Sequence, residues 1–170
     1  MFLGFNFFFL LCFLLGIFNI AKADVIEDAN KYTVKIKSSI EYPFYEDEAG
    51  MGKGAGFLVN KEKGWIFTNA HVSGRGNARV YIAFKNKKYI KAELYYVDPL
   101  LDIAIIKVNP KKIDQDNVNA NLQCSQKKLN GVEVAAYGHP EGLSFSASRG
   151  IISQKRYKYG ADWLQTDAAI

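Results

Sequence analysis

The stretch Gly64–Val72, with the sequence GWIFTNAHV, decides the fold that this chain predicts. A glycine opens a short apolar run, and the run ends at a polar turn that carries His71, one of two histidines in the chain. A strand that delivers its last side chain to a loop is a common setting for a functional group. His71 is therefore the first candidate for a catalytic or binding residue.

Asp102 is the second candidate, because it stands directly before the apolar run Ile103–Val108. A carboxylate at the mouth of a buried strand needs a partner, since burying an unpaired charge is costly. If that partner is a neutral imidazole, the carboxylate fixes one tautomer and leaves the other ring nitrogen free to take a proton from a hydroxyl. The spacing alone is weak evidence, because a lone histidine at a strand end is usually structural.

Short strands separated by turns account for most of the chain. Alternating apolar residues predict half-buried strands at Lys31–Ile40 and Arg79–Phe84, and the run Ile103–Val108 predicts a strand buried on both faces. Two apolar runs that flank Asn60–Gly64 predict a hairpin. No segment shows convincing helical periodicity over about ten residues. The pattern predicts an all-β sandwich or barrel.

A polar segment, Lys111–Gln126, divides the strands into two series and is predicted to be a linker. The second series has expected strands at Val132–Tyr137, Ser144–Ser153 and Trp163–Thr166. The predicted organisation is a signal peptide at 1–23, an N-terminal β-barrel at 24–112 and a partial C-terminal β-barrel at 113–170.

The signal peptide is predicted from composition. Phe2–Ile20 is almost wholly apolar, and Ala21–Ala23 has small residues at the two positions that a signal peptidase reads. The stretch before the apolar run lacks the usual Lys or Arg, so an uncleaved membrane anchor is the alternative. Both readings predict that the rest of the chain is exported.

Composition excludes several other classes of protein. The 170 residues are 49% hydrophobic and 23% charged, which argues against disorder. The net charge of +5 comes from scattered basic residues, whereas nucleic-acid binding would need a basic stripe or a known motif. Cys124 is the only cysteine outside the predicted signal, so we expect no internal disulfide. Its neighbours include no histidine that could activate it.

Six segments follow one another in an order that carries a family resemblance. They are GAGF at 54–57, GWIFTNAHV at 64–72, DPLLDIAIIKV at 98–108, YGHPEG at 137–142, GIIS at 150–153 and LQTDAAI at 164–170. Together they resemble the trypsin-like serine proteases of the Deg/HtrA kind, which are exported bacterial quality-control proteases. The resemblance runs from about Val34 to the last residue, and the segments around His71 and at Gln165–Ile170 are the most specific.

The resemblance implies two six-stranded antiparallel β-barrels of chymotrypsin type with the catalytic site between them, the second barrel being incomplete here. By position, His71 corresponds to the general base and Asp102 to the acid that orients it. Asp98 also lies nearby, but it precedes Pro99 and is expected to be a turn residue. The implied chemistry is hydrolysis of polypeptides through an acyl-enzyme, with no metal, cofactor or nucleic acid.

This sequence departs from the family pattern after LQTDAAI, where the family continues into a Gly-Asn-Ser-Gly-Gly loop with the nucleophile. We therefore expect an inactive fragment of a longer protein. The other serines of this region lie on or beside predicted strands rather than in such a turn: Ser144, Ser146, Ser148 and Ser153. His139 is expected to be a surface turn residue, and a zinc site with His71 would lack a third ligand.

The sequence thus predicts an exported serine endopeptidase, periplasmic or secreted from a bacterium, with a homotrimer implied by the family resemblance. Two alternatives stay open. One is a protease homologue that binds peptides without cutting them, and the other is a structural protein anchored in the membrane by an uncleaved N-terminus.

Overall fold

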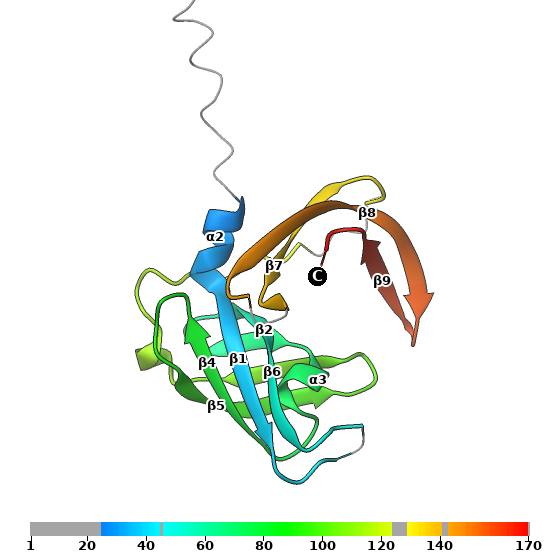
Figure 1. Ribbon diagram of the computed structural model, residues 1–170. Helices are drawn as coiled ribbons and strands as arrows, with labels where there is room; N and C mark the ends of the chain where they lie inside the picture. Colours follow the sequence, from blue (N-terminus) through cyan, green and yellow to red (C-terminus); the bar gives the residue numbers. More distant parts are fainter. Residues whose placement is uncertain (1–24, 45, 124–128, 141–142, 170) are drawn as a thin grey trace, which may run out of the picture.

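The computed structural model describes residues 25–44, 46–123, 129–140 and 143–169. The predicted signal peptide and Cys124 lie outside these residues. The described chain forms a closed six-stranded barrel and a separate three-stranded sheet (Figure 1). This arrangement confirms the predicted all-β class. Among the residues that the structure describes, no helix is long and apolar enough to cross a membrane.

The barrel is built from the first two thirds of the chain. Its elements are α2 (Val25–Tyr32), β1 (Thr33–Ile40), β2 (Gly50–Asn60), β3 (Trp65–Thr68), α3 (Ala70–Ser73), β4 (Ala78–Phe84), β5 (Ile90–Asp98), β6 (Ile103–Lys107) and the 3-10 turn η1 (Pro110–Lys112). The predicted hairpin around Asn60–Gly64 is the β2–β3 connection. The glycine-rich strand β2 begins at Gly50, where it pairs with Ile40 at the end of β1.

The barrel closes because β1 pairs with both β2 and β4, in the order β1-β2-β3-β6-β5-β4, and every pairing is antiparallel. This is the six-stranded antiparallel barrel that the family resemblance implies. Alternation along β1 sends Val34 and Ile36 into the interior, where both are fully buried. Ile36 lies opposite Ile82 of β4, and the register joins the two ends of the sheet around one core.

The core consists mainly of branched aliphatic side chains that point inward from every strand. The largest of these with no exposed surface are Ile36, Leu58, Ile66, Ile82, Ile106, Val34 and Val80. Branched side chains suit a pleated surface that faces other strands. The protein therefore has the conventional packed interior of a small barrel.

Strand β6 is buried on one face, and the prediction that it is buried on both is wrong. Ala104 and Ile106 have no exposed surface, whereas Ile103 is 38% exposed and Ile105 is half-buried. In a closed antiparallel barrel, alternate residues face the interior and the others face outward. The continuous apolar run therefore includes residues on the outer surface of the barrel.

The predicted linker is attached to the barrel along its described part. Ile113 is 7% exposed and belongs to the barrel core. The backbone N–H of Ala120 donates to the carbonyl of Leu58 at 2.7 Å, and that of Val118 donates to the carbonyl of Lys31 at 3.3 Å. The polar segment therefore runs across the barrel surface before the chain enters the second sheet.

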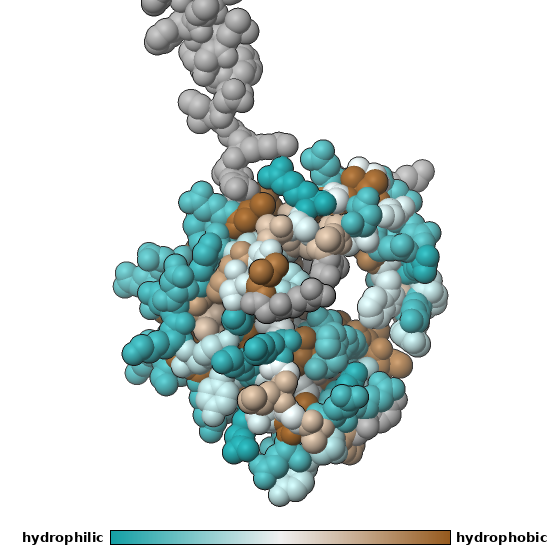
Figure 2. Space-filling model, in the orientation of Figure 1, coloured by the Kyte–Doolittle hydropathy of each residue, from teal (hydrophilic) through white to brown (hydrophobic). Residues whose placement is uncertain are grey.

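The second sheet contains β7 (Glu133–Gly138), β8 (Ser146–Lys158) and β9 (Ala161–Thr166), paired antiparallel in that order. Strand β8 is long and curved, and its hairpin with β9 projects beside the barrel (Figure 1). Figure 2 shows open space between this hairpin and the barrel. Within the described residues the sheet does not close, as expected for an incomplete second barrel.

Two isoleucines of β6 allow the barrel core to be tested. Ile106→Ala removes a fully buried side chain and should lower the free energy of unfolding by about 2–5 kcal/mol, because the neighbouring side chains fill the cavity only in part. Ile103→Ala makes the same chemical change at a residue that is 38% exposed, and should lower the free energy of unfolding clearly less than Ile106→Ala does. Urea denaturation measures both, and equal losses would contradict this description of the core.

Candidate active site

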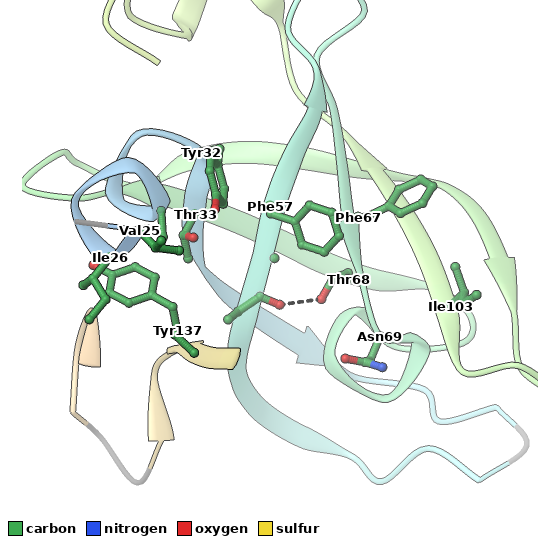
Figure 3. A pocket seen from close by; sticks show the side chains of 14 residues that line it. Val25, Ile26, Tyr32, Thr33, Phe57, Phe67, Thr68, Asn69, Ile103 and Tyr137 are labelled. Atoms are coloured by element: carbon green, nitrogen blue, oxygen red, sulfur yellow. Dashed lines mark hydrogen bonds between the residues drawn. The ribbon is translucent and has the colours of Figure 1, made fainter. Parts of the chain in front are cut away.

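His71 lies on the single turn α3, directly after β3. Asn69 precedes the turn in an extended conformation, with φ −83° and ψ 148°, so the chain changes direction there. At the end of β3, the hydroxyl of Thr68 donates to the carbonyl of Ala55 at 2.8 Å and fixes the exit of the strand (Figure 3). Val72, on the same turn as His71, is 8% exposed and packs into the barrel core.

Asp102 ends the turn between β5 and β6. The Oδ1 atom of Asp98 accepts hydrogen bonds from the backbone N–H groups of Leu100 at 3.0 Å and Leu101 at 2.9 Å. Asp98 is therefore the turn residue, as predicted. Asp102 has φ +54°, a left-handed conformation that aspartate adopts more readily than most residues.

The structure brings His71 and Asp102 into direct contact. The Oδ2 atom of Asp102 lies 2.7 Å from Nδ1 of His71, and its Oδ1 accepts the backbone N–H of His71 at 2.9 Å. The amide of Asn69 donates to the backbone carbonyl of Asp102 at 3.1 Å and to Oδ2 at 3.2 Å. One carboxylate thus holds both the backbone and the ring of the histidine, while Nε2 lies on the opposite side of the imidazole.

The surroundings of Asp102 favour its ionised form. Burial by itself raises the pKa of this carboxyl group, but hydrogen bonds from the backbone and ring of His71, together with the charge of Arg75, lower the pKa below its ordinary value of 3.8. The Asp102 side chain is 26% exposed, whereas that of His71 is 59% exposed. The site therefore presents an ionised carboxylate beside an accessible histidine ring.

One cavity is lined by His71, and a second lies beside Asn69. The first, of about 300 Å³, lies between His71, Arg75 and the segment Glu46–Gly52. The second, of about 490 Å³, lies between α2, β2, β3 and β7, and is lined mainly by apolar side chains that include Phe57 and Tyr137 (Figure 3). Asn69 lines this second cavity, so the apolar space extends to the residue that donates to Asp102.

Two serines in and just before β8 have other hydrogen-bond partners. The hydroxyl of Ser148 donates to the carbonyl of Ala169, and that of Ser144 accepts from the ammonium of Lys35. Ser146, Ser148 and Ser153 belong to β8, where the sequence predicted them. Among the described serines, no hydroxyl is hydrogen-bonded to the ring of His71.

His139 lies in the connection between β7 and β8, as the sequence predicted, but it is half-buried rather than on the surface. Its Nδ1 accepts the backbone N–H of Phe145 at 3.0 Å, and its ring packs edge-on against the Phe145 ring at 4.5 Å. Burial and the charge of Lys35 lower the pKa of His139. Within the described residues, no group of three or more His, Cys, Asp or Glu side chains could hold a metal ion. The contacts between His139 and Phe145 hold the two ends of the β7–β8 connection together.

Three residues of the site were not predicted from the sequence. Asn69 stands inside the GWIFTNAHV motif, where its position directly before the helical turn was an available signal. Arg75 and Asp47 form an ion pair at 3.2 Å, and their side chains are 11% and 2% exposed. The sequence shows both only as members of polar loops, so nothing in it indicated their pairing.

The trypsin-like peptidase domain matches residues 54–170. The chain belongs to the trypsin-like peptidase family. Two similar proteins are the pro-apoptotic serine proteases NMA111 of Yarrowia lipolytica, 33% identical over 129 residues, and of Candida glabrata, 34% identical over 137 residues. The matches cover 76% and 80% of this chain but only 13% and 14% of those relatives.

Two solved structures have the same fold. The HtrA-type protease AlgWS227A with tripeptide superposes with a TM-score of 0.71 at 23% identity, covering 89% of this chain and 47% of that one. The HtrA-type protease AlgW with decapeptide superposes with a TM-score of 0.65 at 22% identity, and the match covers 89% of this chain and 52% of that one. These similarities confirm the resemblance to the trypsin-like serine proteases of the Deg/HtrA kind. The two sequence relatives are fungal, so they lend no support to the expected bacterial source.

Close packing between β2 and α3 offers a test of what positions His71. A methyl group added at Gly54 would lie 2.5–2.6 Å from the two Cγ atoms of Val72, and this branched side chain cannot move away without shifting α3. Gly54→Ala should therefore cost about 1–3 kcal/mol of stability and weaken the His71–Asp102 hydrogen bond. The low-field proton NMR signal of His71 Nδ1–H measures that bond.

Gly138→Ala is the matched control, because its new methyl group would meet the Cβ of Ala55 at an ordinary 3.4 Å. This variant should keep both the stability and the NMR signal. A Gly54→Ala protein with an unchanged signal would show that the glycine does not position α3.

Proposed function

We propose that the protein to which this chain belongs is a serine endopeptidase, with His71 as the general base and Asp102 as the acid that orients it. The observation that carries the proposal is the two-point contact of Asp102, 2.7 Å to Nδ1 and 2.9 Å to the backbone nitrogen of His71. Membership of the trypsin-like peptidase family supports it.

The geometry accounts for the chemistry of each residue. The carboxylate keeps the proton on Nδ1, so Nε2 can accept a proton from a serine hydroxyl as that oxygen attacks a peptide carbonyl. The resulting imidazolium then donates the proton to the leaving amine. A lowered pKa keeps Asp102 ionised throughout, so that it stabilises the imidazolium. A general base of this kind contributes about 10²–10⁴-fold to the rate.

We place the nucleophilic serine and the backbone amides of the oxyanion hole in a segment that follows LQTDAAI at 164–170. The described serines support this proposal, because those of β8 and its approach are strand residues or have other partners. The small share of the relatives' length that the chain spans is in keeping with a longer protein.

The substrates that we propose are polypeptides bound in an extended conformation. An extended peptide can add to an exposed strand edge, where main-chain hydrogen bonds supply affinity. The two structures with the same fold contain a tripeptide and a decapeptide, which supports this substrate class for the present chain.

The test compares the 170-residue chain with the product of the longer reading frame, using a serine-directed phosphonate and an unfolded protein substrate. The longer protein should react with the phosphonate and hydrolyse the substrate, and His71→Ala should abolish hydrolysis. Asp102→Asn should lower kcat by about 10⁴-fold, since an amide stabilises the wrong tautomer. The 170-residue chain should neither react with the phosphonate nor hydrolyse the substrate.

Asp98→Asn is the matched control, because an asparagine can accept the same backbone hydrogen bonds in the turn. It should leave kcat within a few-fold of the parent protein. Hydrolysis by the 170-residue chain that is lost in His71→Ala would overturn the assignment of the nucleophile. A longer protein that binds peptides but neither cuts nor reacts would be a non-catalytic homologue.

We also propose that the protein is exported, to the periplasm or the medium if its source is bacterial. The support is the apolar run Phe2–Ile20 followed by Ala21–Ala23. N-terminal sequencing of protein recovered outside the cytoplasm should begin at Asp24. Ala23→Arg should block the cleavage, because signal peptidase requires a small residue there, whereas Asp24→Asn should not. A parent protein that begins at Met1 would contradict cleavage.

A further inference from the structure

Arg75 follows α3 and Gly74, close in sequence to His71, and its side chain is largely buried. Gly74 has φ +83°, a left-handed conformation that suits glycine and turns the chain back after the helical turn. The Arg75 side chain is only 11% exposed. A charged side chain is rarely buried to this degree without a partner.

The partner of Arg75 is the acidic segment Glu46–Glu48 on the β1–β2 connection. Asp47, whose side chain is 2% exposed, accepts the backbone N–H of Arg75 at 2.8 Å and the guanidinium at 3.2 Å. Glu46 lies 3.6 Å from the other end of the guanidinium and is 69% exposed. The segment is thus tied to the chain that leaves α3 through both the backbone and the side chain of one arginine.

This ion pair adjoins the candidate active site. Arg75, Glu46 and Asp47 line the 300 Å³ cavity together with His71, so the acidic segment forms a wall of the space beside the imidazole. The positive charge of Arg75 is also among the causes that lower the pKa of Asp102. Arg75 therefore contacts the acidic segment directly and lines the same cavity as His71.

We propose that Arg75 is a positioning residue of the peptidase site, which couples the acidic segment Glu46–Glu48 to the Asp102–His71 pair electrostatically. The inference rests on the proposed function, because it concerns the same two residues. The segment partly neutralises Arg75, and the remaining positive charge acts on the Asp102 carboxylate. A substrate that displaces the segment or changes its charge would alter how strongly this carboxylate is held ionised.

Removing the charge of Arg75 and removing the charge of Asp47 should shift the pKa of Asp102 in opposite directions. Arg75→Gln removes a cation that stabilises the carboxylate, so the pKa of Asp102 should rise. Asp47→Asn removes the anion that neutralises Arg75, so the pKa of Asp102 should fall further. A purely structural role predicts changes of the same sign, because both variants break the same ion pair and release the same segment.

The experiment follows the carboxyl carbon of Asp102 by NMR through an acid titration of the full chain. Arg75→Lys keeps the charge and should give an Asp102 pKa close to that of the parent. Arg79→Gln is the matched control, since it removes one positive charge from an exposed ion pair, Arg79–Glu41 at 2.9 Å, and should leave the Asp102 pKa unchanged.

Shifts of opposite sign in Arg75→Gln and Asp47→Asn support the coupling, and shifts of the same sign or none overturn it. If either buried variant fails to fold, Glu46→Gln decides the matter. Glu46 is 69% exposed, so its substitution should leave the fold intact and lower the pKa of Asp102, whereas an unchanged or raised pKa would overturn the coupling. The titration needs no turnover, so it is separate from the phosphonate test of the proposed function.

Discussion

The site depends on one carboxylate that holds one histidine at two points. Asp102 bonds the backbone N–H of His71 at 2.9 Å and its ring at 2.7 Å, although 31 positions separate the two residues in sequence. Strand pairing makes this possible, because Thr68 at the end of β3 lies opposite Ala104 near the start of β6. A slip of one residue in this register would turn alternate side chains to the other face of the sheet and separate the pair.

Close packing against the barrel fixes the turn that carries the histidine. Val72 lies so near Gly54 that even a methyl group would not fit between them, and Gly56 is similarly close to Ile36 and the carbonyl of Phe67. Small residues on β2 therefore bring α3 and β3 against the sheet. The precise position of His71 thus depends on the same core that gives the barrel its stability.

Charged groups around the site are partly buried and paired. Burial raises the pKa of Asp102, but the hydrogen bonds from His71 and the nearby positive charge lower it below its ordinary value. Arg75 is paired with the nearly buried Asp47. Pairs of this kind are costly to break, because removal of one partner leaves an uncompensated charge. The start of the loop Glu46–Gly52 is thereby held to Arg75, and this loop, Arg75 and His71 line one cavity.

The sequence by itself determined the features that depend on neighbouring residues. Alternation predicted the barrel strands, Asp98 before a proline predicted the turn, and the motif order predicted the family. Only the tertiary structure decided that β6 has one outward face, that Arg75 meets Asp47, and that His139 is packed against Phe145. The reason is physical: local patterns set the backbone conformation, whereas burial and ion pairing depend on which distant segments the closed barrel brings together.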